Sequence, residues 1–329
     1  MVSFFRLGHL ASALALLAVN TGSLQAESMG ERIGGEMKRI FQECQPAVVR
    51  VRASDNGCLR SGSGFFIDSA GTVYTHAGVV CRSGEVFIEH NGKTYPAQVA
   101  VSDDRSGVAI LKTACQSPFI RVGDSESLAT ATPVIAIGFP MDREASPSLG
   151  MIAGRDRHEA GQYFSTSHLR ANLPVSNGEA GAPVLNFNGE VIGILMARLR
   201  DASACHILPI RAAEKVRRDL ARFGELRHAW VGVEVEDSET PTDGSTARVS
   251  GLSDAASSVL QPGDVVLSIG GFPVRSSEDV LDAAFYLTAG EQSAIRVVRS
   301  GRALDIIVNP QRHPSCGMPL QQVNAAPTR

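Results

Sequence analysis

The chain lacks several features that would assign it to a common functional class. It has no long basic block and a formal net charge of −3, which argues against nucleic-acid binding. Beyond residue 26 no apolar run is long enough to cross a membrane, so no integral membrane segment is expected. The 6 cysteines form no C-x-x-C pair and the 8 histidines show no H-x₃-H spacing, so neither a metal site nor a cofactor is predicted. The alternative, a zinc site at Cys81, Cys205 and His206, lacks both spacings.

The first 26 residues have the pattern of a secretory signal peptide. Arg6 precedes an apolar run from Leu10 to Val19, and small residues lead to a cleavage site after Ala26. We therefore expect an exported, soluble protein, most simply a periplasmic one. Residues 27–45 carry apolar side chains close to helical spacing, which predicts a lead-in helix before the first strand.

From Pro46 the pattern changes to short runs of β-forming residues separated by turn signals. Asn188-Gly189 lies between two such runs and predicts a two-residue hairpin turn of type I′. Many short strands at close spacing indicate a barrel or a sandwich rather than an α/β sheet. A helix from Arg211 to Leu220, ending near Gly224, closes this part, and its basic residues are expected to form a solvated face.

The last block, residues 228–310, begins with a strand-like segment at Trp230. Pro262-Gly263 and Gly270-Gly271 mark turns, and residues 277–284 have a helical composition. Residues 311–329 are rich in proline and glutamine and are predicted to be disordered.

An ordered series of short motifs resembles the Deg/HtrA family of exported serine proteases. The motifs are Pro46-Ala47-Val48-Val49, Gly62-Ser63-Gly64-Phe65, Gly138-Phe139-Pro140, Gly150-Met151-Ile152, Gly189-Glu190-Val191-Ile192-Gly193-Ile194, Ile207-Leu208-Pro209-Ile210 and Gln261-Pro262-Gly263-Asp264-Val265. The resemblance implies a mainly β fold, with a trypsin-like double β-barrel over residues 46–224 and a PDZ domain over residues 228–310.

Two loops of the resemblance lack their reactive side chains. Residues 75–80 read T-H-A-G-V-V and resemble T-N-N-H-V-V, which puts Gly78 at the position of the general base. Residues 103–112 resemble D-P-x-T-D-L-A-V-L-K, with Gly107 in place of the aspartate that orients the base.

The nucleophile loop shows the same loss. Residues 178–183 read G-E-A-G-A-P where the family has G-N-S-G-G-P, so Ala180 replaces the serine, and Glu179 and Ala182 also depart from the pattern. Acyl transfer to a hydroxyl needs a nucleophile, a base and a carboxylate that holds the base. The resemblance therefore implies an inactive serine protease homologue without catalytic residues.

Two binding features need no reactive side chain. The backbone amides of Gly178 and Ala180 can form an oxyanion-type pocket, the alternative being a collapsed loop. Trp230-Val231-Gly232-Val233 resembles the carboxylate-binding loop of PDZ domains, which implies binding of polypeptide segments or protein C-termini. The alternative for this second feature is that its apolar side chains only fill the core.

The leading hypothesis is a pseudoprotease that acts as a scaffold, a chaperone-like protein or a regulator. One alternative is an active serine-type endopeptidase with a rearranged site, built from His76, Ser176 and Asp103 or Asp104. Another is an oligomeric structural or assembly protein, because the lead-in segment resembles the trimer-forming segments of the family.

The cysteines of an exported protein make disulfides plausible. In the implied barrel, the strand leaving Cys58 and the loop holding Gly78 lie side by side, so a Cys58–Cys81 bond is expected, with free buried thiols as the alternative.

Overall fold

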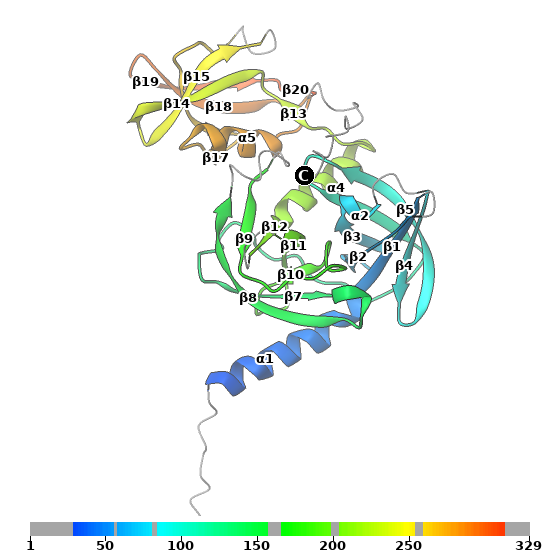
Figure 1. The fold of residues 1–329 in the computed structure, drawn as a ribbon. Helices are drawn as coiled ribbons and strands as arrows, with labels where there is room; N and C mark the ends of the chain where they lie inside the picture. Colours follow the sequence, from blue (N-terminus) through cyan, green and yellow to red (C-terminus); the bar gives the residue numbers. More distant parts are fainter. Residues whose placement is uncertain are drawn as a thin grey trace, which may run out of the picture.

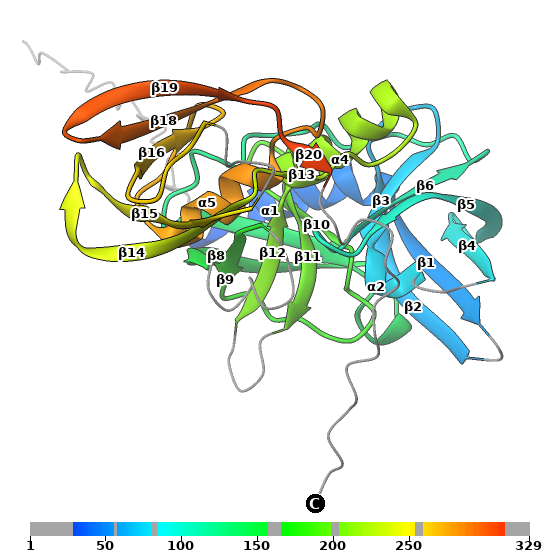
Figure 2. The same ribbon diagram turned by 90° about the horizontal axis from the view of Figure 1, so that it is seen from above.

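The computed structural model describes residues 29–55, 58–80, 84–156, 166–198, 204–253 and 259–312. Two closed antiparallel barrels follow one another along the chain, and a third β region lies against them, with a helix on the side that faces the barrels (Figures 1 and 2). The predicted signal peptide, residues 1–26, lies outside the described residues.

The lead-in segment forms the helix α1 (Met29–Cys44), followed by the 3₁₀ turn η1 (Gln45–Ala47). Its last turns pack on the barrels, since Ile40 and Cys44 are buried. Met29, in contrast, is 70% exposed and Ile33 is 37% exposed. Figure 1 shows the first turns of α1 projecting away from the barrels. Among the apolar side chains of α1, only those in the C-terminal half of the helix are therefore buried against other residues of the described chain.

The first barrel is closed in the order β1-β2-β3-β6-β5-β4. Its strands are β1 (Val48–Asp55), β2 (Cys58–Phe66), β3 (Thr72–His76), β4 (Glu85–His90), β5 (Lys93–Asp103) and β6 (Val108–Thr113), and the short helix α2 (Ala77–Val80) follows β3. In β4 the side chains of Val86, Ile88 and His90 are buried, and Phe87 and Glu89, which alternate with them, are partly exposed. This period of two is what a strand with one buried face requires.

The second barrel is closed in the order β10-β11-β12-β9-β8-β7. Its strands are β7 (Pro133–Gly138), β8 (Ser146–Asp156), β9 (His168–Ala171), β10 (Pro183–Leu185), β11 (Val191–Arg198) and β12 (Cys205–Pro209), and the 3₁₀ turn η2 (Pro140–Asp142) follows β7. Closure of both barrels leaves no strand edge exposed.

The turn between β10 and β11 differs from the two-residue hairpin that the sequence predicts. The amide of Asn186 donates to the carbonyl of Glu190 over 2.9 Å, and that of Gly189 donates to the carbonyl of Asn186 over 3.1 Å, so the loop holds three residues. The Asn186 side-chain oxygen accepts from the amides of Asn188 and Glu190 and so stabilises the wider turn. Gly189, with φ +73°, takes the left-handed position that ends such a loop.

The helix α4 (Ile210–Phe223) leads from the second barrel to the last region and ends at Gly224, whose φ is +70°. The expectation that its basic residues are all solvated is wrong at Lys215. This side chain is buried, and its ammonium pairs with Asp219 and donates to the carbonyl of Arg227 over 3.3 Å. Burial lowers the pKa of Lys215 although Asp219 favours the charged form. The cause is tertiary, because the C-terminal region covers this part of α4.

The C-terminal region contains a sheet in the order β14-β15-β16-β18-β19 and a small β13-β20 pair. Its elements are β13 (Ala229–Trp230), β14 (Val233–Thr242), β15 (Ser245–Leu252), β16 (Val265–Ile269), β17 (Phe272–Pro273), α5 (Ser277–Phe285), β18 (Ser293–Arg299), β19 (Arg302–Val308) and β20 (Gln311–Arg312). The prediction of disorder from residue 311 is wrong for Gln311 and Arg312, because they pair with Trp230 and Ala229. The remainder, 313–329, lies outside the described residues.

The C-terminal region is joined to the barrels by apolar and polar contacts. Phe285 and Tyr286, at the end of α5, belong to the same buried cluster as the barrel core. The Arg211 guanidinium of α4 lies 3.9 Å from the ring centre of Phe272 and 3.7 Å from that of Tyr286. Asp282 of α5 accepts hydrogen bonds from residues 166 and 167.

A buried acid–base pair also crosses this junction. Asp103, at the end of β5, accepts a hydrogen bond from Nε2 of His228 over 2.7 Å, and both side chains are 3% exposed. Burial opposes ionisation of Asp103, but the bonds from His228 and Ser106 outweigh it and lower the pKa of Asp103. The pair fixes the start of the C-terminal region to the first barrel.

We expect Asp103→Asn to destabilise the protein by about 1–3 kcal/mol at neutral pH, because a charge-assisted buried bond is replaced by a weaker one. The folded-state pKa of Asp103 lies below the unfolded value of about 3.9, so its contribution is fully present above that value and is lost as the pH falls through the folded-state pKa. Urea unfolding between about pH 7 and pH 3 should show the difference between the two proteins shrinking toward acid. Asp305→Asn, at an exposed ion pair with Arg296, is the control and should show little effect. A difference independent of pH would contradict this account.

Candidate functional site

The three loops with missing reactive side chains meet between the barrels. The amide of Ala77, next to Gly78, donates to the carbonyl of Gly107 over 2.7 Å. The amide of Ser63 on β2 donates to the carbonyl of Ala180 over 2.8 Å. A Cβ atom placed on Gly181 would lie only 2.7 Å from the amide nitrogen of His76. Contacts of this kind bring Gly78, Gly107 and Ala180 into one region.

At the predicted base position, the ring of His76 lies against the backbone of Gly78. A Cβ atom on Gly78 would lie 2.7 Å from Cε1 of His76, so the ring occupies the space beside the glycine. Burial lowers the pKa of His76 to about 4, which keeps the ring neutral near pH 7. Within the described ranges the ring makes no hydrogen bond to Ser176 or to another serine. His76 and Ser176 are therefore not assembled as a base and nucleophile here.

The turn that holds Gly107 uses its aspartate elsewhere. Gly107 has φ +81°, and its amide donates to the carbonyl of Asp103 over 2.8 Å. The Asp103 carboxylate accepts from the Ser106 hydroxyl over 2.5 Å and from the His228 ring. Asp103 thus closes a turn and contacts the C-terminal region instead of supporting His76.

The loop with Ala180 has a defined backbone orientation. The carbonyl of Asn177 accepts from the amide of Met141 over 2.6 Å, and the carbonyl of Gly178 accepts from the Ser63 hydroxyl over 2.8 Å. A trans peptide directs its N–H opposite to its C=O, so the Gly178 amide points away from Met141. Among the described residues, neither this amide nor that of Ala180 donates to a protein acceptor.

Glu179 does not extend into the cleft. Its side chain is buried, and a carboxylate oxygen accepts from the amide of Ser176 over 2.6 Å. Burial raises the pKa of Glu179, the Ser176 amide acting in the opposite direction. A Cβ atom on Gly138 would lie 3.1 Å from Cγ of Glu179 and 3.2 Å from Cβ of Ala182, so both departures from the family pattern pack inside the second barrel.

The predicted peptide-binding loop connects β13 to β14. Trp230 pairs with Gln311, and Val231 is buried. Gly232 has φ +74°, and its carbonyl accepts from the amide of Ser253 over 2.8 Å. Val233 begins β14, which pairs with β15 and forms an edge of the described sheet. The loop therefore precedes a strand that has one side free for an added strand.

A cavity of about 710 Å³ adjoins this loop. Its lining includes Val231, Ala289 and two basic side chains, Arg227 and Arg312, that the sequence analysis did not select. Both arginines pair with Glu225, so the positive charge is partly compensated. No motif marks these arginines in the sequence, because their neighbourhood depends on the pairing of β13 with β20.

The predicted Cys58–Cys81 disulfide lies outside the described part of the structure, which leaves out the Cys58 side chain and all of Cys81. Cys44, Cys115 and Cys205 are free and buried. Within the described ranges no three His, Cys, Asp or Glu side chains are grouped to hold a metal ion. None of the helices in that same portion is both long and apolar enough for a membrane span.

Sequence comparison supports the relationship that the motifs suggest. Residues 62–194 match the model of the trypsin-like peptidase domain. A DegP-like protein of Pseudomonas putida (strain W619), named as a periplasmic serine endoprotease, is 28% identical over 263 residues, covering 75% of this chain and 55% of its own length. The chain thus spans about half the length of that relative. HhoB of Synechocystis sp. (strain ATCC 27184 / PCC 6803 / Kazusa), named as a serine protease, is 30% identical over 316 residues, covering 88% of this chain and 74% of HhoB.

Comparison with solved structures confirms the mainly β double-barrel fold that the sequence predicts. The HtrA-type protease AlgW with tripeptide superimposes with a TM-score of 0.72 at 21% identity, covering 84% of this chain and 97% of AlgW. Barrels, loop order and sequence relatives agree, and the chain therefore belongs to the HtrA/DegP family of trypsin-like serine protease homologues.

Proposed function

We propose that the protein is an exported pseudoprotease that binds polypeptide segments or C-termini and acts as a scaffold, a chaperone-like protein or a regulator. The observation that carries the proposal is the meeting of the three loops that contain Gly78, Gly107 and Ala180. None of these residues can attack a carbonyl, accept a proton or hold a base. The signal-peptide pattern and the periplasmic naming of the Pseudomonas relative support export.

The contacts around His76 weigh against a rearranged endopeptidase. Such a site needs a nucleophile, a base and an orienting group in mutual hydrogen-bond reach. His76 makes no hydrogen bond to a serine of the described chain, and Asp103 is engaged by His228. A rearranged endopeptidase site would require His76 to leave its packing against Gly78 and Asp103 to leave its hydrogen bond with His228.

Purified protein is expected to leave unfolded casein intact, because loss of the serine or histidine of a triad costs on the order of a millionfold in turnover. Gel analysis over a day, with trypsin as the positive control, measures this. The same assay with His76→Ala and Ser176→Ala tests the rearranged site. Casein cleavage that either substitution abolishes would overturn the pseudoprotease proposal.

Peptide recognition is assigned to the loop around Gly232 and the free edge of β14, acting as a PDZ domain. Backbone donors in such a loop capture a terminal carboxylate, and the peptide adds to the sheet as a strand. The left-handed φ of Gly232 and the edge position of β14 support this assignment.

Gly232→Ala is expected to weaken binding of a carboxyl-terminal peptide by at least about tenfold, because alanine disfavours the left-handed conformation that shapes the loop. Gly244→Ala is the matched control, since Gly244 also has a positive φ, +85°, but lies in the β14–β15 turn with open space around it. Fluorescence anisotropy with a peptide selected from a C-terminal library measures the affinity. Equal binding by the amidated form of the peptide would argue against carboxylate capture.

A second candidate role, assembly through α1, is favoured by the exposure of its apolar side chains. Met29 and Ile33 belong to the first turns of α1 and are 70% and 37% exposed. A second copy of the chain would bury them.

Light scattering is expected to show an oligomer for the native chain and a smaller mass for the double variant Met29→Glu/Ile33→Glu, because buried glutamates would destabilise a packed interface. Leu281→Glu, which changes a 65% exposed residue on α5, is the control and should keep the native mass. An unchanged mass in the double variant would count against assembly through α1.

A further inference from the structure

The edge strand of the C-terminal region carries charge of only one sign. Residues 229–247 contain five acidic residues and no lysine or arginine, in a chain whose formal net charge is −3. The acids are Glu234, Glu236, Asp237, Glu239 and Asp243. All but the last lie on β14, and Figure 2 shows β14 and β19 at opposite edges of the described sheet. A strand that adds to this edge therefore meets several carboxylates.

The side chains of β14 divide between its two faces. Val233 and Val235 are partly buried and pack against the core of the C-terminal region. Asp237 lies on the same face, because it accepts two hydrogen bonds from the first residue of α5, over 2.9 and 2.6 Å. Since side chains alternate along a strand, Glu234 and Glu236 lie on the other face, and both are exposed.

Within the described chain, neither of these two glutamates has an ion pair or a hydrogen bond. Opposite Glu234 on β15 stands Gly251, which has no side chain to pair with it. Opposite Glu236 stands Arg248, but its guanidinium donates to the Ser238 hydroxyl over 3.4 Å. The negative charge on this face of β14 is therefore left without a partner from the neighbouring strand.

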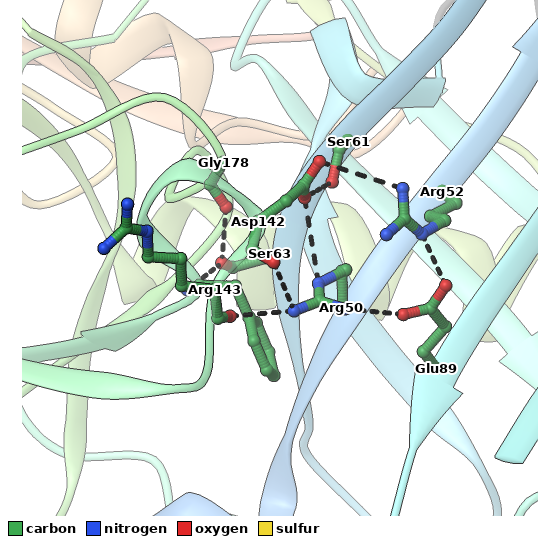
Figure 3. A network of polar contacts seen from close by, with 9 residues as sticks. Arg50, Arg52, Ser61, Ser63, Glu89, Asp142, Arg143 and Gly178 are labelled. Atoms are coloured by element: carbon green, nitrogen blue, oxygen red, sulfur yellow. Dashed lines mark hydrogen bonds and ion pairs between the residues drawn. The ribbon is translucent and has the colours of Figure 1, made fainter. Parts of the chain in front are cut away.

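A strand acid of the first barrel shows the contrasting case (Figure 3). Glu89 of β4 accepts from Arg50 of the neighbouring β1 over 2.7 Å and from Arg52 over 2.5 Å. The same two arginines lie 3.7 and 3.8 Å from the Asp142 carboxylate. Acids on adjoining elements of the barrels are thus paired inside the chain, whereas on β14 the cations are left to a strand added from outside.

The register of such an added strand follows from where its carboxylate is held. A peptide with its C-terminus at the Gly232 loop has that end beside the first residues of β14, so it runs antiparallel to the strand. Its last residue then lies opposite Val233, its second from the end opposite Glu234, and its fourth from the end opposite Glu236. Directly opposite residues have Cβ atoms about 4.5–5.5 Å apart, which is within reach of a lysine or arginine side chain.

We propose that Glu234 and Glu236 select peptides with lysine or arginine at the second and fourth positions from the C-terminus and apolar residues at the first and third. The inference rests on the proposed function, since it names the class of peptide that the edge of β14 takes. Opposite charges directly across two strands stabilise their pairing, and like charges destabilise it. An acidic strand, such as β14 of a second copy, is disfavoured for the same reason.

Three fluorescent peptides test the proposal on the full chain. Each ends with valine at the first and third positions, and the second and fourth positions are both lysine, both glutamine or both glutamate. Anisotropy should show the lysine peptide binding at least about threefold more tightly than the glutamine peptide and about tenfold more tightly than the glutamate peptide. The preference should shrink as salt rises from about 0.05 to about 0.5 M, because these charges are exposed.

The double variant Glu234→Gln/Glu236→Gln should lose the preference for lysine and bind the glutamine peptide as the native chain does. Retained binding of the glutamine peptide also shows that the variant is folded. Asp243→Asn/Asp305→Asn is the matched control. It removes the same charge from the β14–β15 turn and from β19 at the opposite edge, so it should keep the preference.

Equal binding of the lysine and glutamine peptides by the native chain would overturn the inference and leave peptide recognition standing. It would assign the two glutamates to blocking edge-to-edge pairing between copies. A lysine preference that survives in the glutamate double variant, or that the control variant also loses, would overturn it as well. Binding of none of the three peptides would instead contradict peptide recognition at β14 itself.

Discussion

The arrangement of the cleft depends on one buried serine. Ser63 is fully buried, its amide holds the carbonyl of Ala180, and its hydroxyl joins Gly178 to Phe139. Its own carbonyl accepts from the Thr75 hydroxyl over 2.7 Å, next to His76. Through this residue the base loop, the nucleophile loop and the segment after β7 share one set of hydrogen bonds. In a buried environment each of these bonds is costly to leave unmade.

Because these bonds are made largely by backbone groups, the cleft does not require the side chains of a working triad. Gly78, Gly107 and Ala180 carry no reactive side chain, and the peptide groups that shape the three loops still have hydrogen-bond partners. Gly181 shows how tight the packing is, since a Cβ atom there would lie 2.2 Å from the Ser63 carbonyl oxygen. The shape of these loops thus does not depend on the side chains of a catalytic triad.

Short runs of β-forming residues and turn residues are local signals, and they predict a mainly β chain with a barrel or a sandwich. The double barrel itself follows from the family resemblance, which the ordered motifs carry. Features that depend on residues far away in the chain were either not predicted from the sequence or predicted wrongly. Lys215 stands in a basic helical segment that predicts a solvated side chain, but it is buried beside Asp219, the Arg227 carbonyl and the Phe285 ring. Gln311 and Arg312 are ordered through pairing with β13, and Asp103 is taken by His228, 125 positions away in the chain. Alternation of Arg50 and Arg52 with the valines of β1 places both on one face, but nothing local identifies Asp142 as their partner.

The position of His76 makes residues 76 and 78 of the base loop depend on each other. Its ring fills the space that a side chain at position 78 would enter, and position 107 has a backbone conformation that suits glycine. A side chain introduced at position 78 would displace this ring, so a replacement there also moves His76. The effect of a replacement at position 78 therefore depends on the residue at position 76, so changes at these two positions are not expected to be additive.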